Sequence, residues 1–245
     1  MTSKYLELHG RRLKLLTQKL TKKVYNQTAP VYSISALLFH TKAHRRCLDL
    51  AGSLEGKSVL EVPIGSGQLF SELVRRNRSG FTAGVDLSPR MVSVVQRRMN
   101  GNGFGGNGNS RNGAAALVRD NGRIGGYCLQ AAGAQSMPFA DGSFDVLFNC
   151  YLLELLKPVD IERTLKEFRR VLRPGGKLLI VDPSDHSNLF RAVYNSLGFA
   201  VPAFWGRVVA REVHNLLEAG GFELQHNQIV SQTFYPSMVT MARRT

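Results

Sequence analysis

The stretch Val59-Leu60-Glu61-Val62-Pro63-Ile64-Gly65-Ser66-Gly67 decides the fold, because it reads as a buried strand that ends at a glycine turn. Its first half is short, apolar and β-branched, as in a strand covered on both faces. Gly65 and Gly67 allow a sharp turn and leave no Cβ between the backbone and a ligand. Apolar residues then recur at helical spacing over residues 68–76, so a helix amino terminus points toward the same crevice.

A second strand, expected over residues 81–86, ends at Asp86, nineteen residues beyond Gly67. A glycine turn after the first strand and an acid at the end of the second are typical of nucleoside-binding α/β domains, where the acid binds the ribose hydroxyls. The dinucleotide-binding fingerprint requires a small residue three positions after the second glycine. This chain has Phe70 there, which disfavours a pyrophosphate-binding turn.

Two later segments indicate the cofactor. Residues 134–145 read Ala-Gln-Ser-Met-Pro-Phe-Ala-Asp-Gly-Ser-Phe-Asp, and residues 169–177 read Arg-Arg-Val-Leu-Arg-Pro-Gly-Gly-Lys. Together with the two strand ends, these motifs resemble the class I S-adenosylmethionine-dependent methyltransferases, and most of all the group that includes the ubiquinone/menaquinone-biosynthesis C-methyltransferases. The resemblance covers residues 25–242 and implies S-adenosylmethionine as the cofactor. It also implies an α/β fold: a Rossmann-like doubly wound sheet of seven strands in the order 3-2-1-4-5-7-6, with the last strand antiparallel.

The resemblance assigns a role to individual residues. Glu61 attracts the cationic amino-acid end of the cofactor, and Asp86 accepts hydrogen bonds from both ribose hydroxyls. Each acid also has a purely structural reading, as a strand-end cap for backbone amides or as a helix-start acid. The full set of expected cofactor-binding residues is Tyr25, Glu61, Gly65, Ser66, Gly67, Asp86, Leu87, Ala134, Gln135 and Asn149.

Two positions depart from the family pattern. Pro63 stands where the family usually has glycine, and it removes a backbone donor and fixes φ near −65°. Gly133 stands where the family often has an acid that binds the adenine amino group. We expect cofactor binding to survive, with adenine affinity lower by roughly 1–2 kcal/mol, the contribution of one polar contact.

The acceptor is less well defined than the cofactor. Methyl transfer requires alignment more than a dedicated base, and the candidates for catalytic residues are Tyr32, Asn149, Tyr151 and His186. His186 follows Asp182 and Asp185, a cluster that could accept a proton or form an ordinary polar turn. Quinone-modifying relatives typically carry Phe-Gly-x-Arg-Asn where this chain has Asn-Cys-Tyr-Leu-Leu-Glu at 149–154, so the acceptor is a small or lipid-like molecule of open identity.

The domain organisation follows from composition. Residues 1–50 are expected to form a basic helical lid, in which Tyr25 and Tyr32 match a family signature, and residues 51–245 the methyltransferase domain. The Gly/Asn-rich stretch at about 100–122 has no periodicity and is predicted to be a disordered insertion. Three cysteines without CxxC spacing indicate reduced thiols, and no metal site is expected.

The chain has a net charge of +14, and residues 1–47 hold ten of its 32 Lys and Arg but one of its 18 acids. This segment is read as a solvated lid, as a contact to an anionic membrane, as an RNA-binding surface or as an organelle presequence. Nucleic acid is the less favoured partner, because no aromatic residues accompany the charges. The expected location is cytoplasmic or peripheral at a membrane. A catalytically silent cofactor-binding regulatory domain and a nucleic-acid methyltransferase are the alternative functions.

Overall fold

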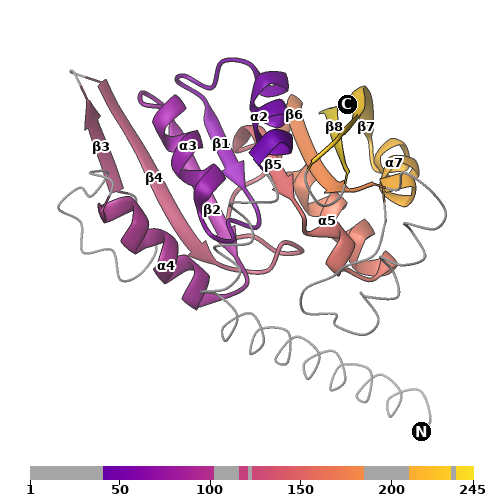
Figure 1. Cartoon of the computed structure of the whole chain (residues 1–245), viewed down its shortest axis with the longest axis horizontal. Coiled ribbons are helices and arrows are strands. Elements are labelled where there is room, and N and C mark those ends of the chain that lie inside the picture. The colour runs from indigo at the N-terminus through magenta and orange to yellow at the C-terminus, as the bar shows by residue number, and fades with distance from the viewer. Residues whose placement is uncertain (1–40, 102–115, 121–122, 185–209, 233–235) are drawn as a thin grey trace, which may run out of the picture.

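The computed structural model describes residues 41–101, 116–120, 123–184, 210–232 and 236–245. Within them, one mixed sheet of eight strands carries helices on both faces (Figure 1). The strands are β1 (Ser58–Glu61), β2 (Phe81–Asp86), β3 (Ala116–Asp120), β4 (Arg123–Ala131), β5 (Phe144–Cys150), β6 (Leu172–Pro183), β7 (Phe222–Val230) and β8 (Ser237–Arg244). The helices are α2 (Thr41–Ala51), α3 (Gln68–Arg76), α4 (Pro89–Met99), the short 3-10 helix η2 (Leu153–Leu155), α5 (Pro158–Val171) and α7 (Ala210–Ala219).

The sheet order is β3-β4-β2-β1-β5-β6-β8-β7. Without β3 this is the predicted order 3-2-1-4-5-7-6, which is therefore confirmed. Strands β4, β2, β1, β5 and β6 run parallel, whereas β8 pairs antiparallel with both β6 and β7. The last strand of the chain thus lies between the two before it, as the resemblance implied.

Strand β3 is a departure from the sequence prediction of an insertion without structure at about 100–122. Residues 102–115 and 121–122 lie outside the described part of the chain, but Ala116–Asp120 pairs antiparallel with β4. Asp120 is the register partner of Arg123, which leaves the dipeptide Asn-Gly at 121–122 between the two strands. Asn-Gly between two short runs is a strong sequence signal for a two-residue hairpin. The strand predicted from Gly126 accordingly begins at Arg123.

The helices divide between the two faces of the sheet. Apolar residues of α2, α3 and α4 pack against one face, and those of α5 and α7 against the other (Figure 1). Local sequence sets where each helix begins: Ser88 caps α4 by accepting a hydrogen bond from the Met91 amide at 3.3 Å, and Pro89 occupies the first helical position. Of the predicted lid, only residues from 41 onward are described, and they form most of α2.

The five parallel strands end at one edge of the sheet, and that edge positions the polar residues of interest. Glu61 and Asp86 end β1 and β2, Asn149 lies one residue before the end of β5, and Asp182 lies one residue before the end of β6. In doubly wound folds ligands bind outside the carboxyl ends of the strands.

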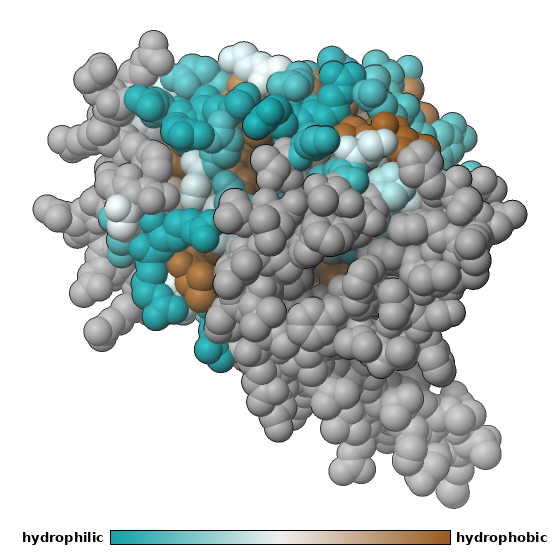
Figure 2. All heavy atoms as spheres, in the orientation of Figure 1, coloured by the Kyte–Doolittle hydropathy of each residue, from teal (hydrophilic) through white to brown (hydrophobic). Residues whose placement is uncertain are grey.

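Two features of the surface concern contact with a membrane: its apolar areas and the helices that could cross one. The described part of the face seen in Figure 2 is largely hydrophilic, and its apolar residues form small, separate areas. Within the described ranges, no helix combines the length and apolar character that crossing a membrane requires.

Candidate functional site

The glycine turn after β1 is held against α4. Gly65 and Gly67 have φ of +46° and +75°, values that L side chains rarely adopt. The Gly67 amide donates to the Ile64 carbonyl at 2.8 Å, and a Cβ on Gly67 would lie 2.7 Å from the Val95 side chain. Glycine at position 67 therefore serves both the backbone conformation and the close packing of α4.

Asp86 ties this turn to the start of α4. One carboxylate oxygen accepts from the Gly65 amide at 3.1 Å, and the other accepts from the Ser88 amide at 2.9 Å. The side chain is 8% exposed. Burial raises the pKa of Asp86 to about 6, although the two amides act in the opposite direction. Each oxygen keeps a lone pair for a ligand, so the carboxylate is fixed in place and still able to accept hydroxyl hydrogen bonds.

A mostly apolar pocket opens beside Asp86. Its wall includes six of the residues predicted to bind the cofactor or act in catalysis. These are Gly65, Asp86, Leu87, Ala134, Gln135 and Tyr151. The remaining lining residues are Val62, Pro63, Ser88, Met91, Ala132, Gly133, Leu152, Leu155 and Leu156.

The loop that follows β4 forms one side of the pocket. The Ala132 amide donates to the Asp86 carbonyl at 3.0 Å, and Ser136 donates back to Gly133 at 3.1 Å, so this loop is fixed against β2. At Gly133, an added Cβ would lie 3.4 Å from the Gln135 side chain and 4.0 Å from Leu87. The position therefore has room for a side chain. Glycine in place of the family's acid leaves this part of the pocket open.

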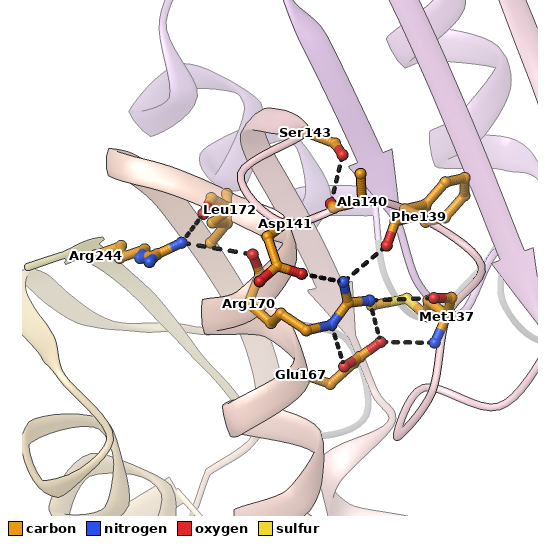
Figure 3. Close-up of polar contacts among 9 residues, drawn as sticks. All are labelled: Met137, Phe139, Ala140, Asp141, Ser143, Glu167, Arg170, Leu172 and Arg244. Carbon is orange, nitrogen blue, oxygen red and sulfur yellow. Dashed lines mark hydrogen bonds and ion pairs between the residues drawn. The ribbon is translucent and has the colours of Figure 1, made fainter.

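A network centred on Arg170 of α5 holds the continuation of that loop (Figure 3). The guanidinium donates to the carbonyls of Phe139 at 2.7 Å and Met137 at 3.1 Å, and it pairs with Asp141 at 2.7 Å and Glu167 at 2.8 Å. Glu167 also accepts from the Met137 amide at 2.6 Å, and Arg170 keeps the pKa of Glu167 below its ordinary value. The sequence analysis did not identify this network, whose signal was a Glu three residues before the second Arg of the Arg-Arg-Val-Leu-Arg-Pro-Gly-Gly run.

Glu61 and Asn149 are not among the residues that line the pocket, and their side chains lie on opposite faces of the sheet. Glu61 is 3% exposed, and its Oε2 has no hydrogen-bond partner among the described residues. Burial, followed by the proximity of Cys150 and Asp86, raises the pKa of Glu61 well above its ordinary value. The Asn149 amide nitrogen donates to the Val62 carbonyl at 2.7 Å, and its Oδ1 likewise lacks a partner in the described chain.

The other candidates divide into three groups. Ser66 is buried within the glycine turn. Tyr151 lines the pocket, but its hydroxyl is bonded to Ser237 at 2.9 Å and to Gln232 at 3.0 Å, and burial raises its pKa. Tyr25, Tyr32 and His186 lie outside the described residues. In the described ranges, no three His, Cys, Asp or Glu side chains group as metal ligands.

The residues at this edge fit S-adenosylmethionine. Glu61 and Asp86 are buried acids whose raised pKa values show that their negative charge is poorly compensated, and a cationic ligand would compensate it. The unpartnered Oε2 of Glu61 suits an ammonium or sulfonium group. The fixed Asp86 carboxylate suits a ribose, and the apolar wall suits an aromatic base.

Comparisons with known proteins agree with this geometry. Residues 60–180 match a family described as a methyltransferase domain. The chain is 29% identical to the ubiquinone/menaquinone biosynthesis C-methyltransferase UbiE of Hahella chejuensis over 198 residues, covering 78% of this chain and 70% of that protein. It is 27% identical to the demethylmenaquinone methyltransferase of Thermus thermophilus over 192 residues, covering 76% and 77%. In fold, it resembles an S-adenosylmethionine-dependent methyltransferase of Aquifex aeolicus with a TM-score of 0.61 at 19% identity, over 90% of this chain and 98% of that one.

Proposed function

Because the chain belongs to the class I S-adenosylmethionine-dependent methyltransferases, we propose that it methylates a quinone-like small molecule at the pocket beside Asp86. S-adenosylmethionine supplies an activated methyl group when it is bound. What the chain's own residues must do is hold the cofactor and the acceptor in line and exclude water. The observation that carries the proposal is the Asp86 carboxylate, fixed by two backbone amides at the rim of an apolar pocket.

We assign the cofactor's parts to the predicted residues as follows. Asp86 binds the ribose hydroxyls, and Glu61 faces the cationic end of the methionine moiety. The glycine turn approaches that moiety through its backbone, since Gly65 and Gly67 carry no Cβ. The remaining assignments are Ser66 with the glycine turn, Leu87, Ala134 and Gln135 for adenine, Asn149 near the methyl group, and Tyr25 in the lid.

The acceptor assignment rests on the pocket and on the relatives. Leu152, Leu155 and Leu156 provide an apolar wall on the side of η2, which suits a ring carrying a hydrophobic chain. The relatives from Hahella and Thermus are named for methylation in quinone biosynthesis. A hydroquinone is therefore the acceptor class to test first.

We further propose a cytoplasmic location at the surface of an anionic membrane. The three cysteines are free and buried, which suits a reducing compartment. A basic segment at residues 1–47 would be attracted to acidic lipids, where a lipid-like quinone is also found. Sedimentation with anionic vesicles should decrease on deletion of residues 1–23, and vesicle binding that is unchanged by the deletion would contradict this location.

Calorimetric titration with S-adenosylmethionine tests the cofactor site. We expect binding by the wild type, a loss of at least tenfold in affinity for Asp86→Ala, and no change for Asp49→Asn, an exposed acid on α2. Transfer of labelled methyl to reduced 1,4-naphthohydroquinone then tests the acceptor. Binding of the cofactor without transfer to any hydroquinone would refute the acceptor class and leave the cofactor site intact.

A further inference from the structure

Three buried polar side chains at the carboxyl ends of β5 and β6 have polar atoms that the fold does not use. Asn149, Asp182 and Ser184 are 0%, 2% and 0% exposed. Among the described residues, no hydrogen-bond partner reaches Asn149 Oδ1, either carboxyl oxygen of Asp182, or Ser184 Oγ. We call these three residues the polar stripe.

The register of the sheet places the polar stripe on one face. Asn149 is the register partner of Ile180, and residues two apart on a strand point to the same side. Asp182 and Ser184 therefore follow Ile180 on that side. The pairing persists to the end of the strand, because the Ser184 amide donates to the Pro236 carbonyl at 2.9 Å.

The polar stripe adjoins the proposed pocket. Asn149 Nδ2 donates to the carbonyl of Val62, which lines the pocket, and Leu152 and Leu156, which also line it, pack against the same hydrophobic cluster as Ile180. The 3-10 helix η2 packs on the same face, since its Leu153 shares a hydrophobic cluster with Ile180. Glu61 belongs to the opposite face, in register with Phe148, so the polar stripe is separate from the carboxylate assigned to the cofactor's cationic end.

Buried polar groups in native proteins nearly always have partners, and an unpaired buried carboxylate is costly. Burial raises the pKa of Asp182 to about 7, and the backbone amide of Glu154 acts in the opposite direction. The titratable residue Glu154 on η2 adjoins Asp182, and the register partner of Asp182 on β8 is Met238. A ligand that donates hydrogen bonds here would satisfy the stripe.

We propose that the polar stripe binds a hydroxyl of an aromatic hydroquinone acceptor, and that Asp182 is the catalytic residue that takes the proton of that hydroxyl. The inference rests on the proposed function and names the group that the acceptor must carry. Tyr151 is not available for this role, because its hydroxyl is already bonded to Ser237 and Gln232.

The proton path balances over one turnover. The hydroxyl proton moves to the Asp182 carboxylate, and the electron density left on oxygen makes the neighbouring ring carbon nucleophilic. That carbon forms its bond to the incoming methyl group as the methyl–sulfur bond breaks. The ring C–H proton then leaves to solvent, and Asp182 returns its proton to the oxygen. The product is a methylated hydroquinone, and one proton is released overall.

A binding experiment tests the inference without relying on turnover. Protein saturated with S-adenosylhomocysteine is titrated, under anaerobic reducing conditions, with 1,4-naphthohydroquinone and with 1,4-dimethoxynaphthalene, in which both hydroxyls are blocked. We expect the wild type to bind the hydroquinone at least tenfold more tightly than the diether, as for a hydrogen bond to a charged group. Asp182→Asn should lose that preference, and Ser184→Ala should reduce it severalfold.

Affinity for S-adenosylmethionine serves as the check on folding, and should stay within threefold of the wild type in both variants and in the control Asp49→Asn. Asp182→Glu should restore part of kcat where Asp182→Asn lowers it about 100-fold or more. If the wild type fails to discriminate the two compounds, or Asp182→Asn keeps the preference, the inference is wrong. Methyl transfer to the hydroquinone by a fully active Asp182→Asn would refute the inference while supporting the proposed function. Hydroxyl-dependent binding through Asp182 without methyl transfer would support the polar stripe as a hydroxyl-binding site, and would refute both the proposed function and the proton-transfer role of Asp182.

Discussion

Acidification should weaken S-adenosylmethionine binding through Asp86. Its pKa of about 6 means that about nine tenths of the side chain is ionised at pH 7 and about one tenth at pH 5. If the ribose hydroxyls bind the carboxylate form, affinity follows the ionised fraction and falls about tenfold between these two pH values. An aspartate with an ordinary pKa of 3.8 would stay more than about nine tenths ionised throughout, and affinity would barely change.

Stability of the ligand-free protein should show the opposite trend. The folded-state pKa lies above the unfolded value, so the folded chain binds more protons between about pH 4 and 6. The free energy of unfolding therefore contains a penalty from Asp86 that is absent below pH 4. That penalty grows to about 3 kcal/mol above pH 6, from a pKa of about 6 against 3.8.

Calorimetry at pH 7 and pH 5 measures the first effect, and urea unfolding of the ligand-free protein over the same range measures the second. Asp86→Asn is the matched variant, since it keeps the size of the side chain and cannot titrate. Its affinity should be weaker and should fall less than that of the wild type on acidification, because only Glu61 still titrates among the two acids assigned to the cofactor. The free energy of unfolding of Asp86→Asn should rise relative to that of the wild type as pH rises, because the variant lacks the penalty from Asp86. Equal wild-type affinity at both pH values, or the same decline in Asp86→Asn, would refute the assignment of Asp86 to the ribose.

Three further substitutions test the supporting structure. Gly133→Asp should raise cofactor affinity by about 5- to 30-fold in calorimetry, because the position has room for a side chain and gains one polar contact of about 1–2 kcal/mol; Gly133→Ala should give no gain. Gly67→Ala should lower the free energy of unfolding by roughly 2–4 kcal/mol, since positive φ adds to overlap with Val95. The control Gly175→Ala has the same sign of φ but open space, and should cost only about 1–2 kcal/mol in the same denaturant series. Arg170→Lys should weaken cofactor affinity severalfold, because a lysine cannot bridge two carbonyls and two carboxylates at once; unchanged affinity would show that the network does not hold the adenine side of the pocket.

The sheet could be predicted from sequence because its main signals are local. A glycine turn, an acid at a strand end and the Pro-Gly-Gly stop each depend on a few adjacent residues, and their order along the chain limits the topology to one family of folds. Strand β3 was not predicted, because the composition of the residues before it outweighed its own short local signal. The glycine and asparagine content of residues 101–113 hid the short apolar run that follows and the Asn-Gly at 121–122. Composition averaged over the segment gave no sign of the five residues that pair with β4.

The site was predictable only in part. Gly65, Asp86, Leu87, Ala134, Gln135 and Tyr151 line one pocket, and each is a strand-end or turn position. Whether a polar atom has a partner depends on residues distant in sequence, so no local pattern distinguishes Asp182 from an acid in a solvated turn. The Arg170 network has the same character, since it joins α5 to a loop about 30 residues earlier.

Three buried acids at one edge of the sheet lower the free energy of unfolding of the ligand-free protein at neutral pH. Glu61, Asp86 and Asp182 all have raised pKa values with burial as the largest cause, and Asp86 contributes to the shift at Glu61. Asparagine or glutamine at these positions would remove that electrostatic cost, so acids at all three positions are understandable if ligands supply the missing charge and hydrogen bonds. Under the proposed function, the cationic end of the cofactor would satisfy Glu61, its ribose would satisfy Asp86, and a hydroxyl-bearing acceptor would satisfy Asp182. On this reasoning the order of the acids along the edge, from β2 through β1 to β6, is also the order in which ribose, methionine moiety and acceptor lie.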